Sequence, residues 1–142
     1  MNLANAIKIA SDAHLNQKDR GGYPYILHPL WVMHKVRHLG EDYMIVAILH
    51  DVVEDTEVTL DDLFNANFNN NILYALNLLT HNPNVSYMDY ILNLAHNNLA
   101  REVKLRDLEH NSKITRLKGL REKDFQRLQK YQIAYDYLKN YK

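Results

Sequence analysis

Cysteine is absent from this 142-residue sequence. Disulfides, iron–sulfur clusters and thiol nucleophiles are therefore excluded, and any bound metal must be held by His, Asp or Glu. No segment approaches the roughly 18 uninterrupted apolar residues of a membrane-spanning helix. Residues 1–5 lack the cationic start and the apolar run of a signal peptide. We therefore expect a soluble, cytoplasmic protein with no membrane partner.

Net charge is also absent, since 17 basic residues balance 17 acidic ones. This balance argues against a protein that binds nucleic-acid polymers. The charges are unevenly spread, because residues 41–62 carry eight acids and no lysine or arginine, whereas residues 101–130 carry ten Lys/Arg and five acids. The pattern fits either ordinary solvated faces or an acidic metal-holding segment opposite a basic segment that meets an anionic substrate.

In the first half of the chain, apolar residues recur with the period of an α-helix. Nowhere do apolar and polar residues alternate convincingly with the period of a strand. An apolar face over residues 3–17 predicts a first helix that residues 21–24 break. A second helix is expected from Pro29 to a C-cap at Gly40. Residues 43–49 are apolar all round, which predicts a buried central helix that ends at the pair His50-Asp51.

The second half is helical as well. Thr59 has the character of a helix N-cap, and the asparagine-rich residues 65–71 form either a loop or a polar helix edge. Further helices are predicted over residues 72–79, 86–97, 99–117 and 123–141. The apolar stripe of the last helix indicates core packing more than a partner interface. The sequence therefore predicts one all-α domain, a helical bundle over residues 1–142.

Four potential metal ligands occur in order along the chain: His28, the pair His50-Asp51, and Asp107. Two imidazoles and two carboxylates suit a divalent transition metal and leave room for water. His28 precedes a proline, which favours extended backbone and places the ring at the mouth of the next helix. Simpler interpretations exist, since His28 can be a polar helix cap and Asp107 can pair with Lys104.

Two further acids follow the His-Asp pair. Glu54 lies four residues after His50, and Asp55 lies four residues after Asp51, so both are expected on the metal side of the helix. Without a cation these groups would repel one another. The simpler alternative is a solvated acidic helix end. Asn111 lies four residues after Asp107 and is expected on the same face, within reach of a substrate oxygen.

Three segments carry motifs in a fixed order. The first covers residues 13–17 and 22–30, the second covers residues 47–56 with His50-Asp51 and Glu54-Asp55, and the third covers residues 103–107 with residues 110–111. Together they resemble the HD-domain superfamily of metal-dependent phosphohydrolases. More narrowly, they resemble the hydrolase domain of the RelA/SpoT-type alarmone enzymes, of which small stand-alone forms exist.

The resemblance implies an all-helical bundle around a metal, usually manganese. It also implies hydrolytic removal of pyrophosphate from the 3′ position of guanosine tetra- or pentaphosphate, a small-molecule nucleotide of the stringent response. The residues that it implies as metal ligands are His28, His50, Asp51 and Asp107. Those that would position or deprotonate the attacking water are Glu54 and Asp55. Oligomerisation is possible.

For the substrate, the resemblance implies that Asn111 contacts the nucleotide, and the candidate cations are Lys18, Arg20 and Lys104. The family usually has an Arg-Lys pair just before its Asp-Gly, but here Asp19 falls where one of these cations belongs. An acid at that place repels phosphate. Three hypotheses stay open: an alarmone pyrophosphohydrolase, an HD phosphohydrolase for another nucleotide or phosphate ester, and a nucleotide sensor without turnover. The presence of both Glu54 and Asp55 argues against the sensor, which has no need of them.

Overall fold

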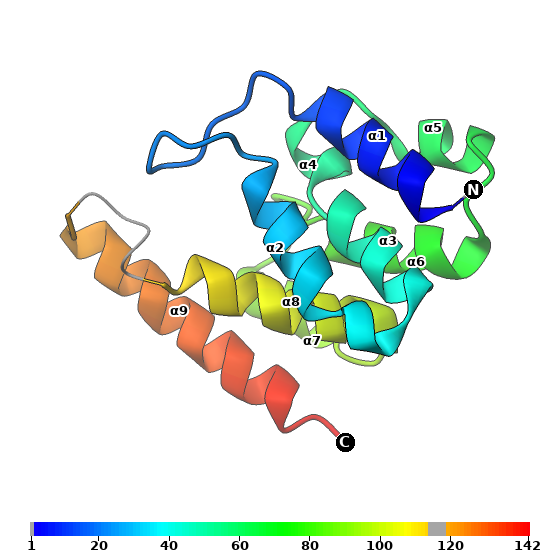
Figure 1. Ribbon diagram of the computed structural model, residues 1–142. Helices are drawn as coiled ribbons and strands as arrows, with labels where there is room; N and C mark the ends of the chain where they lie inside the picture. Colours follow the sequence, from blue (N-terminus) through cyan, green and yellow to red (C-terminus); the bar gives the residue numbers. More distant parts are fainter. Residues whose placement is uncertain (1, 114–118) are drawn as a thin grey trace.

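The computed structural model describes residues 2–113 and 119–142, which form nine α-helices and one short 3-10 helix (Figure 1). The elements are α1 (Leu3–Ala13), α2 (Leu27–Lys35), η1 (Arg37–Leu39), α3 (Glu41–Leu49), α4 (Val52–Asp55), α5 (Leu60–Asn65), α6 (Asn70–Leu79), α7 (Tyr87–Leu94), α8 (Asn98–Asn111) and α9 (Glu122–Lys139). These residues contain no strand, and an isolated bridge joins Lys18 to Pro24. The predicted all-α class is confirmed.

Helix α3 lies at the centre of the bundle. Residues 45–49 are buried on every side, and the helix packs against α1, α2, α6 and α8. Burial of each large aliphatic side chain contributes about 1.5–3 kcal/mol, which explains why this apolar segment takes the centre. The helix predicted over residues 43–49 is confirmed and begins two residues earlier. His50 is its C-cap, so the His-Asp pair leaves the core at a fixed point.

The prediction of extended backbone at His28 is wrong. Helix α2 begins at Leu27, which places His28 within its first turn. Pro29 is tolerated there because the first-turn backbone N–H groups have no partner in the helix. The imidazole nevertheless points inward, with 2% of the residue exposed. The helix is also shorter than expected, since η1 follows it before Gly40 turns the chain at a φ of 120°.

Caps explain the ends of the next helices. Thr59 is the predicted N-cap of α5, and its hydroxyl accepts a hydrogen bond from the backbone N–H of Asp62. The asparagine-rich segment contains both of its expected forms, because Asn67 turns with a positive φ of 68° and Asn69 caps α6. Helix α8 ends at Asn111, before the expected residue 117. Residues 114–117 of that prediction lie outside the described residues.

Helix α9 packs along α8 and α7 (Figure 1). Leu138 is buried, and Tyr131 and Tyr135 pack partly buried against the core. The stripe therefore serves core packing, as the sequence predicts. Among the described residues, no helix combines the length and the apolarity needed to cross a lipid bilayer.

Candidate metal centre

The fold brings the four predicted ligands to one point. His28 comes from α2, His50 and Asp51 from the junction of α3 and α4, and Asp107 from α8. One nitrogen or oxygen of each lies within 4.8 Å of those of the other three. The Nε2 atoms of His28 and His50 lie 2.8 and 3.3 Å from Asp107 Oδ1. His50 Nε2 lies 3.1 Å from Asp51 Oδ2.

Both imidazoles present Nε2 to this point because their other nitrogens are occupied. His50 Nδ1 lies 2.6 Å from the carbonyl oxygen of Ala47, which makes Nδ1 the donor and leaves the Nε2 lone pair toward the cluster. His28 Nδ1 lies 2.8 Å from His110 Nδ1. The ring of His110 is parallel to that of His28, with centroids 5.1 Å apart, and stacks on that of Trp31 at 4.2 Å. Hydrogen bonds of this kind orient imidazole ligands of metals.

The two carboxylates are oriented as well. The hydroxyl of Tyr25 donates to Asp51 Oδ2. Lys104 Nζ donates to Asp107 Oδ2 at 2.8 Å, and Asn111 Nδ2 donates to Asp107 Oδ1 at 2.9 Å. The Lys104 pair that the sequence offered as an alternative to metal ligation therefore coexists with the cluster. It uses one oxygen of Asp107, while the other oxygen faces the imidazoles.

The electrostatics of the cluster favour a cation. Burial alone would lower the pKa of His50, but Asp51 and Asp107 outweigh it and hold that pKa well above its ordinary value. Burial raises the pKa of Asp51, yet the charge of His50 lowers it to about 2. Against burial, Lys104 holds the pKa of Asp107 well below its usual range. Two ionised carboxylates thus draw positive charge to this point, and the donor set fits a divalent transition metal.

The two further acids lie on α4 beside the cluster. Glu54 and Asp55 line a cavity of about 290 Å³ together with Asp51 and Asp107. Glu54 Oε1 accepts a hydrogen bond of 2.6 Å from the backbone N–H of His81. Burial, and then the charges of Asp51 and Glu54, raise the pKa of Asp55 to about 6. The Glu54 carboxylate is thus held by a backbone amide, while Asp55 takes up a proton close to neutral pH.

A further part of the lining of this cavity is aromatic and was not predicted. His81 stacks on Tyr90 with ring centroids 4.6 Å apart and lies edge-on to Tyr87. Lys104 Nζ lies 5.2 Å from the ring centre of Tyr90, and Lys130 Nζ lies 4.5 Å from that of Tyr87. A cation over an aromatic face is stabilised by the ring. Tyr87 and Tyr90 lie on α7 and His81 lies before it, whereas Lys104 comes from α8 and Lys130 from α9, so no single sequence motif marks the wall.

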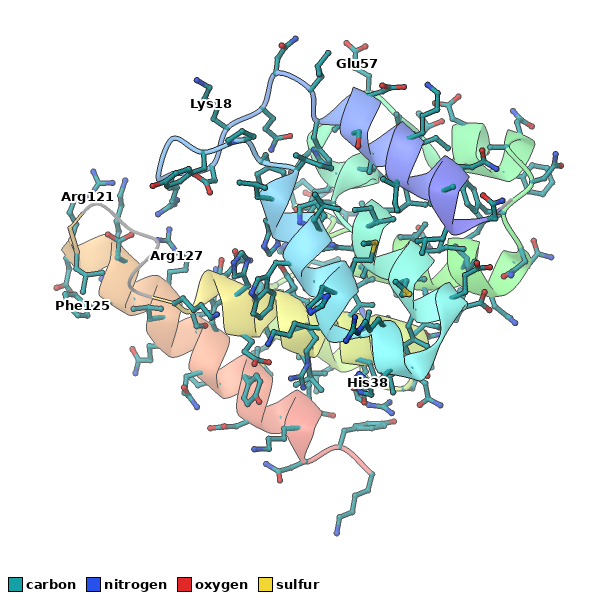
Figure 2. All side chains as sticks on the ribbon, in the orientation of Figure 1. Lys18, His38, Glu57, Arg121, Phe125 and Arg127 are labelled. Atoms are coloured by element: carbon teal, nitrogen blue, oxygen red, sulfur yellow. The ribbon has the colours of Figure 1, made fainter. Side chains whose placement is uncertain are left out.

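The predicted substrate-binding residues divide between two adjoining cavities. Lys104 lines the cavity of the metal cluster, and Lys18 and Arg20 line a second cavity of about 250 Å³. Tyr25, Asn111 and Tyr131 line both cavities, so the two adjoin. Figure 2 shows Lys18 on the loop between α1 and α2, on the same side of the molecule as the near end of α9.

Asp19 has a structural role in that loop. Its carboxylate accepts a hydrogen bond of 2.9 Å from the backbone N–H of Tyr23. The backbone N–H of Asp19 in turn donates to the carbonyl oxygen of Tyr23 at 2.8 Å. An Asp that bonds to backbone a few residues on is a common turn former. The acid that departs from the family pattern therefore closes the turn that presents Lys18 and Arg20.

A helical bundle that gathers a His-Asp pair, a second histidine and a distant aspartate at one point has the HD-domain hydrolase fold. The solved structure of a metazoan orthologue of SpoT that hydrolyses ppGpp has this fold. It matches with a TM-score of 0.81 and 20% identity, over 98% of this chain and 86% of that one. The predicted fold and the resemblance to the RelA/SpoT-type hydrolases are confirmed. No family model matches the chain.

Curated relatives match part of the sequence. The guanosine-3′,5′-bis(diphosphate) 3′-pyrophosphohydrolase of Aquifex aeolicus is 41% identical over 63 residues, 43% of this chain and 9% of that protein. The guanosine-3′,5′-bis(diphosphate) 3′-pyrophosphohydrolase MESH1 of Danio rerio is 40% identical over 67 residues, 37% of its length. The bifunctional (p)ppGpp synthase/hydrolase SpoT of Escherichia coli is 41% identical over 63 residues, 9% of its length. The chain thus spans well under two thirds of these relatives.

Proposed function

We propose that this protein is a metal-dependent phosphohydrolase that removes pyrophosphate from the 3′ position of guanosine-3′,5′-bis(diphosphate). The observation that supports this proposal most strongly is that ligand atoms of four side chains lie within 4.8 Å of one another, beside a cavity with two further acids. The four side chains are those of His28, His50, Asp51 and Asp107. The names of the relatives support the choice of substrate. An enzyme of this kind acts on a small-molecule nucleotide in the cytoplasm and ends the stringent response.

The four clustered side chains would hold the metal, and we propose Mn²⁺. Mixed nitrogen and oxygen ligands with positions left for water suit Mn²⁺, Fe²⁺, Co²⁺ or Ni²⁺ better than a structural zinc. Such an ion, when bound, supplies a water of lowered pKa and polarises a phosphoryl oxygen. The chain's own task is to keep the ligands ionised and oriented, which Tyr25, Lys104 and His110 do through Asp51, Asp107 and His28 respectively.

Glu54 and Asp55 would have different roles toward the attacking water. The amide of His81 holds the Glu54 carboxylate in one place, so Glu54 is suited to orient the water. Asp55, with its pKa raised to about 6, is suited to accept a proton at neutral pH. Attack on phosphorus breaks the bond to the 3′ oxygen of the ribose, and that oxygen takes up the negative charge and then a proton.

Cations along the two cavities would meet the charges of the substrate. Lys104 lies in the metal cavity, where negative charge develops on the bridging and leaving oxygens, so it is placed to stabilise that charge. Lys18 and Arg20 lie in the adjoining cavity, where they would meet another part of the nucleotide. Asn111 lines both cavities and would contact the nucleotide between them.

A second candidate is an HD phosphohydrolase for another nucleotide or phosphate ester. The observation that favours it is Asp19, which lines the second cavity at the place where the family has a cation. Its charge lowers the affinity of that cavity for a guanosine tetraphosphate relative to a less charged nucleotide. The metal centre is common to both candidates, so only the substrate distinguishes them.

The test is a substrate panel with protein loaded with Mn²⁺ and with 3′- and 5′-phosphorylated nucleotides. Release of pyrophosphate and guanosine diphosphate from guanosine-3′,5′-bis(diphosphate) supports the proposal. Orthophosphate release from another nucleotide selects the second candidate, and tight binding without product selects a sensor. His50→Ala should abolish turnover and metal content together. His96→Ala is the matched control, because His96 is exposed and bonds to the hydroxyl of Tyr74 away from the centre.

A further inference from the structure

A buried carboxylate lies behind the second cavity. Asp124 is in the first turn of α9, and only 3% of its side chain is exposed. Its Oδ1 accepts hydrogen bonds from Arg20 Nη1 at 3.1 Å and from Arg127 Nη2, and its Oδ2 accepts one from the backbone N–H of Arg121 at 2.9 Å. Arg20 is 104 residues away in the sequence, so Asp124 ties the loop between α1 and α2 to α9.

The two arginines that Asp124 holds face the cavity, whereas Asp124 does not line it. Figure 2 shows Arg121 and Arg127 at the end of α9 nearest to the loop that carries Lys18. Two guanidinium groups this close repel each other, and the shared carboxylate offsets that repulsion. The Arg20 side chain is 55% exposed. When Asp124 is removed, Arg20 loses the contact that fixes its side chain. A long cationic side chain in water then samples many rotamers.

The cavity has the charge of an anion site. Besides Arg20 and Arg127 it is lined by Lys18 and Lys113, and among the described residues its one lining acid is Asp19, which closes the loop turn. The cavity adjoins that of the metal cluster, with which it shares the lining residues Tyr25, Asn111 and Tyr131. A ligand with one anionic group at the metal can therefore extend a second anionic group to the arginines. Guanidinium groups that are held in place bind phosphate through charge-assisted, directional hydrogen bonds.

We propose that Asp124 is a positioning residue that holds Arg20 and Arg127 together as one anion-binding pair. The ligand class of this pair is a nucleotide with two separate phosphate or diphosphate groups, one at the metal centre and one at the arginines. The proposal rests on the proposed function for the identity of the first group. It adds a residue that does not itself contact the ligand and that determines whether the second group is recognised.

Removal of the Asp124 charge has two opposite effects. It makes the cavity more positive, which attracts an anion, but in contact with water that gain is screened over about 8 Å. It also releases Arg20 and Arg127 from their fixed arrangement, which weakens their directional bonds to phosphate. The loss of the fixed arrangement acts at contact distance, where screening is weak, and so outweighs the gain in positive charge. We therefore expect Asp124→Asn to weaken anion binding about fivefold to tenfold, the equivalent of one ordinary hydrogen bond.

The first experiment needs no turnover. Metal-free protein is titrated with inorganic pyrophosphate at fixed ionic strength, and the dissociation constant is measured by calorimetry. Asp124→Asn should bind about fivefold to tenfold more weakly than wild type. Asp136→Asn should bind as wild type does, because Asp136 is exposed on the same helix and bonds to Gln132. Equal or tighter binding by Asp124→Asn, or no saturable binding by wild type, overturns the proposal.

The second experiment compares two substrates in the Mn²⁺-loaded enzyme. With guanosine-3′,5′-bis(diphosphate), Asp124→Asn should raise KM about fivefold to tenfold and leave kcat within about twofold, because the reacting groups are untouched. With guanosine 3′-diphosphate, which lacks the second group, KM should not change. Equal effects on both substrates, or a loss of kcat alone, contradict the positioning role. If wild type cleaves neither nucleotide, the proposed function fails, while the pyrophosphate titration still decides the role of Asp124.

Discussion

Replacement of Tyr25 by phenylalanine tests whether the groups around the cluster tune its metal affinity. The hydroxyl of Tyr25 donates to Asp51 Oδ2, the oxygen that also lies 3.1 Å from His50 Nε2. Burial and the charge of Asp51 raise the pKa of Tyr25 above its ordinary value, so this hydroxyl stays protonated and remains a donor. Tyr25→Phe removes this one hydrogen bond and nothing else of similar strength.

The structure sets the magnitude. The phenylalanine ring keeps the contacts of Tyr25 with the rings of His14 and His28, whose centroids lie 5.0 and 5.7 Å away. Folding should therefore be preserved. A hydrogen bond to a charged group contributes about 1.5–3 kcal/mol. Loss of a hydrogen bond that orients a metal ligand typically costs about 10–100-fold in metal affinity, or about 1.4–2.7 kcal/mol.

The assay is a titration of metal-free Tyr25→Phe with Mn²⁺, followed by calorimetry and by activity. The apparent dissociation constant should rise about 10–100-fold, and saturating metal should restore turnover. Tyr74→Phe is the control, since the hydroxyl of Tyr74 bonds to the exposed His96. Wild-type metal affinity in Tyr25→Phe, or turnover that saturating metal does not restore, would refute the reasoning.

Three more predictions follow from the same geometry. Because, against the effect of burial, Asp51 and Asp107 raise the pKa of His50 in the absence of metal, a metal competes with a proton for its Nε2, and metal binding should release protons, up to about one per ion. Calorimetry in buffers of different ionisation enthalpy measures this release, affinity should fall as pH is lowered, and proton-neutral binding would contradict it. Glu54→Gln and Asp55→Asn should keep full metal content while kcat falls about 10²–10⁴-fold; unchanged turnover would make them surface acids. Ile48→Ala, at a fully buried site, should lower the free energy of unfolding by about 2–5 kcal/mol in a denaturant titration, and a smaller loss would mean that α3 is not central.

Much of the fold is predictable because its causes are local. The apolar run over residues 43–49 predicts a buried helix from composition alone, and Thr59 predicts a helix start from its cap chemistry. The backbone of His28 is not predictable in this way. The steric preference before a proline favours extended backbone, but the packing of α2 against α3 and α8 supplies more energy than that local preference.

The candidate site likewise contains residues that are predictable from the sequence and residues that are not. Metal ligands occur in motifs, so their residue types and their order along the chain are enough to predict one centre. The groups that hold other residues in place do not occur in motifs. Glu54 is held by a backbone amide, that of His81, which no side-chain pattern can reveal. Asp124 reads in the sequence as one more charge on a solvated helix, because its partner Arg20 is brought to it only by the tertiary fold.

The contact of Trp31 with His110, and of His110 with His28, gives the protein an internal optical reporter. Trp31 is the one tryptophan of the chain, and its ring lies 4.2 Å from that of His110, which bonds to His28. Indole emission responds to the charge and orientation of a stacked imidazole. Occupancy of the centre can therefore be followed by fluorescence without a label, in stopped-flow or plate format.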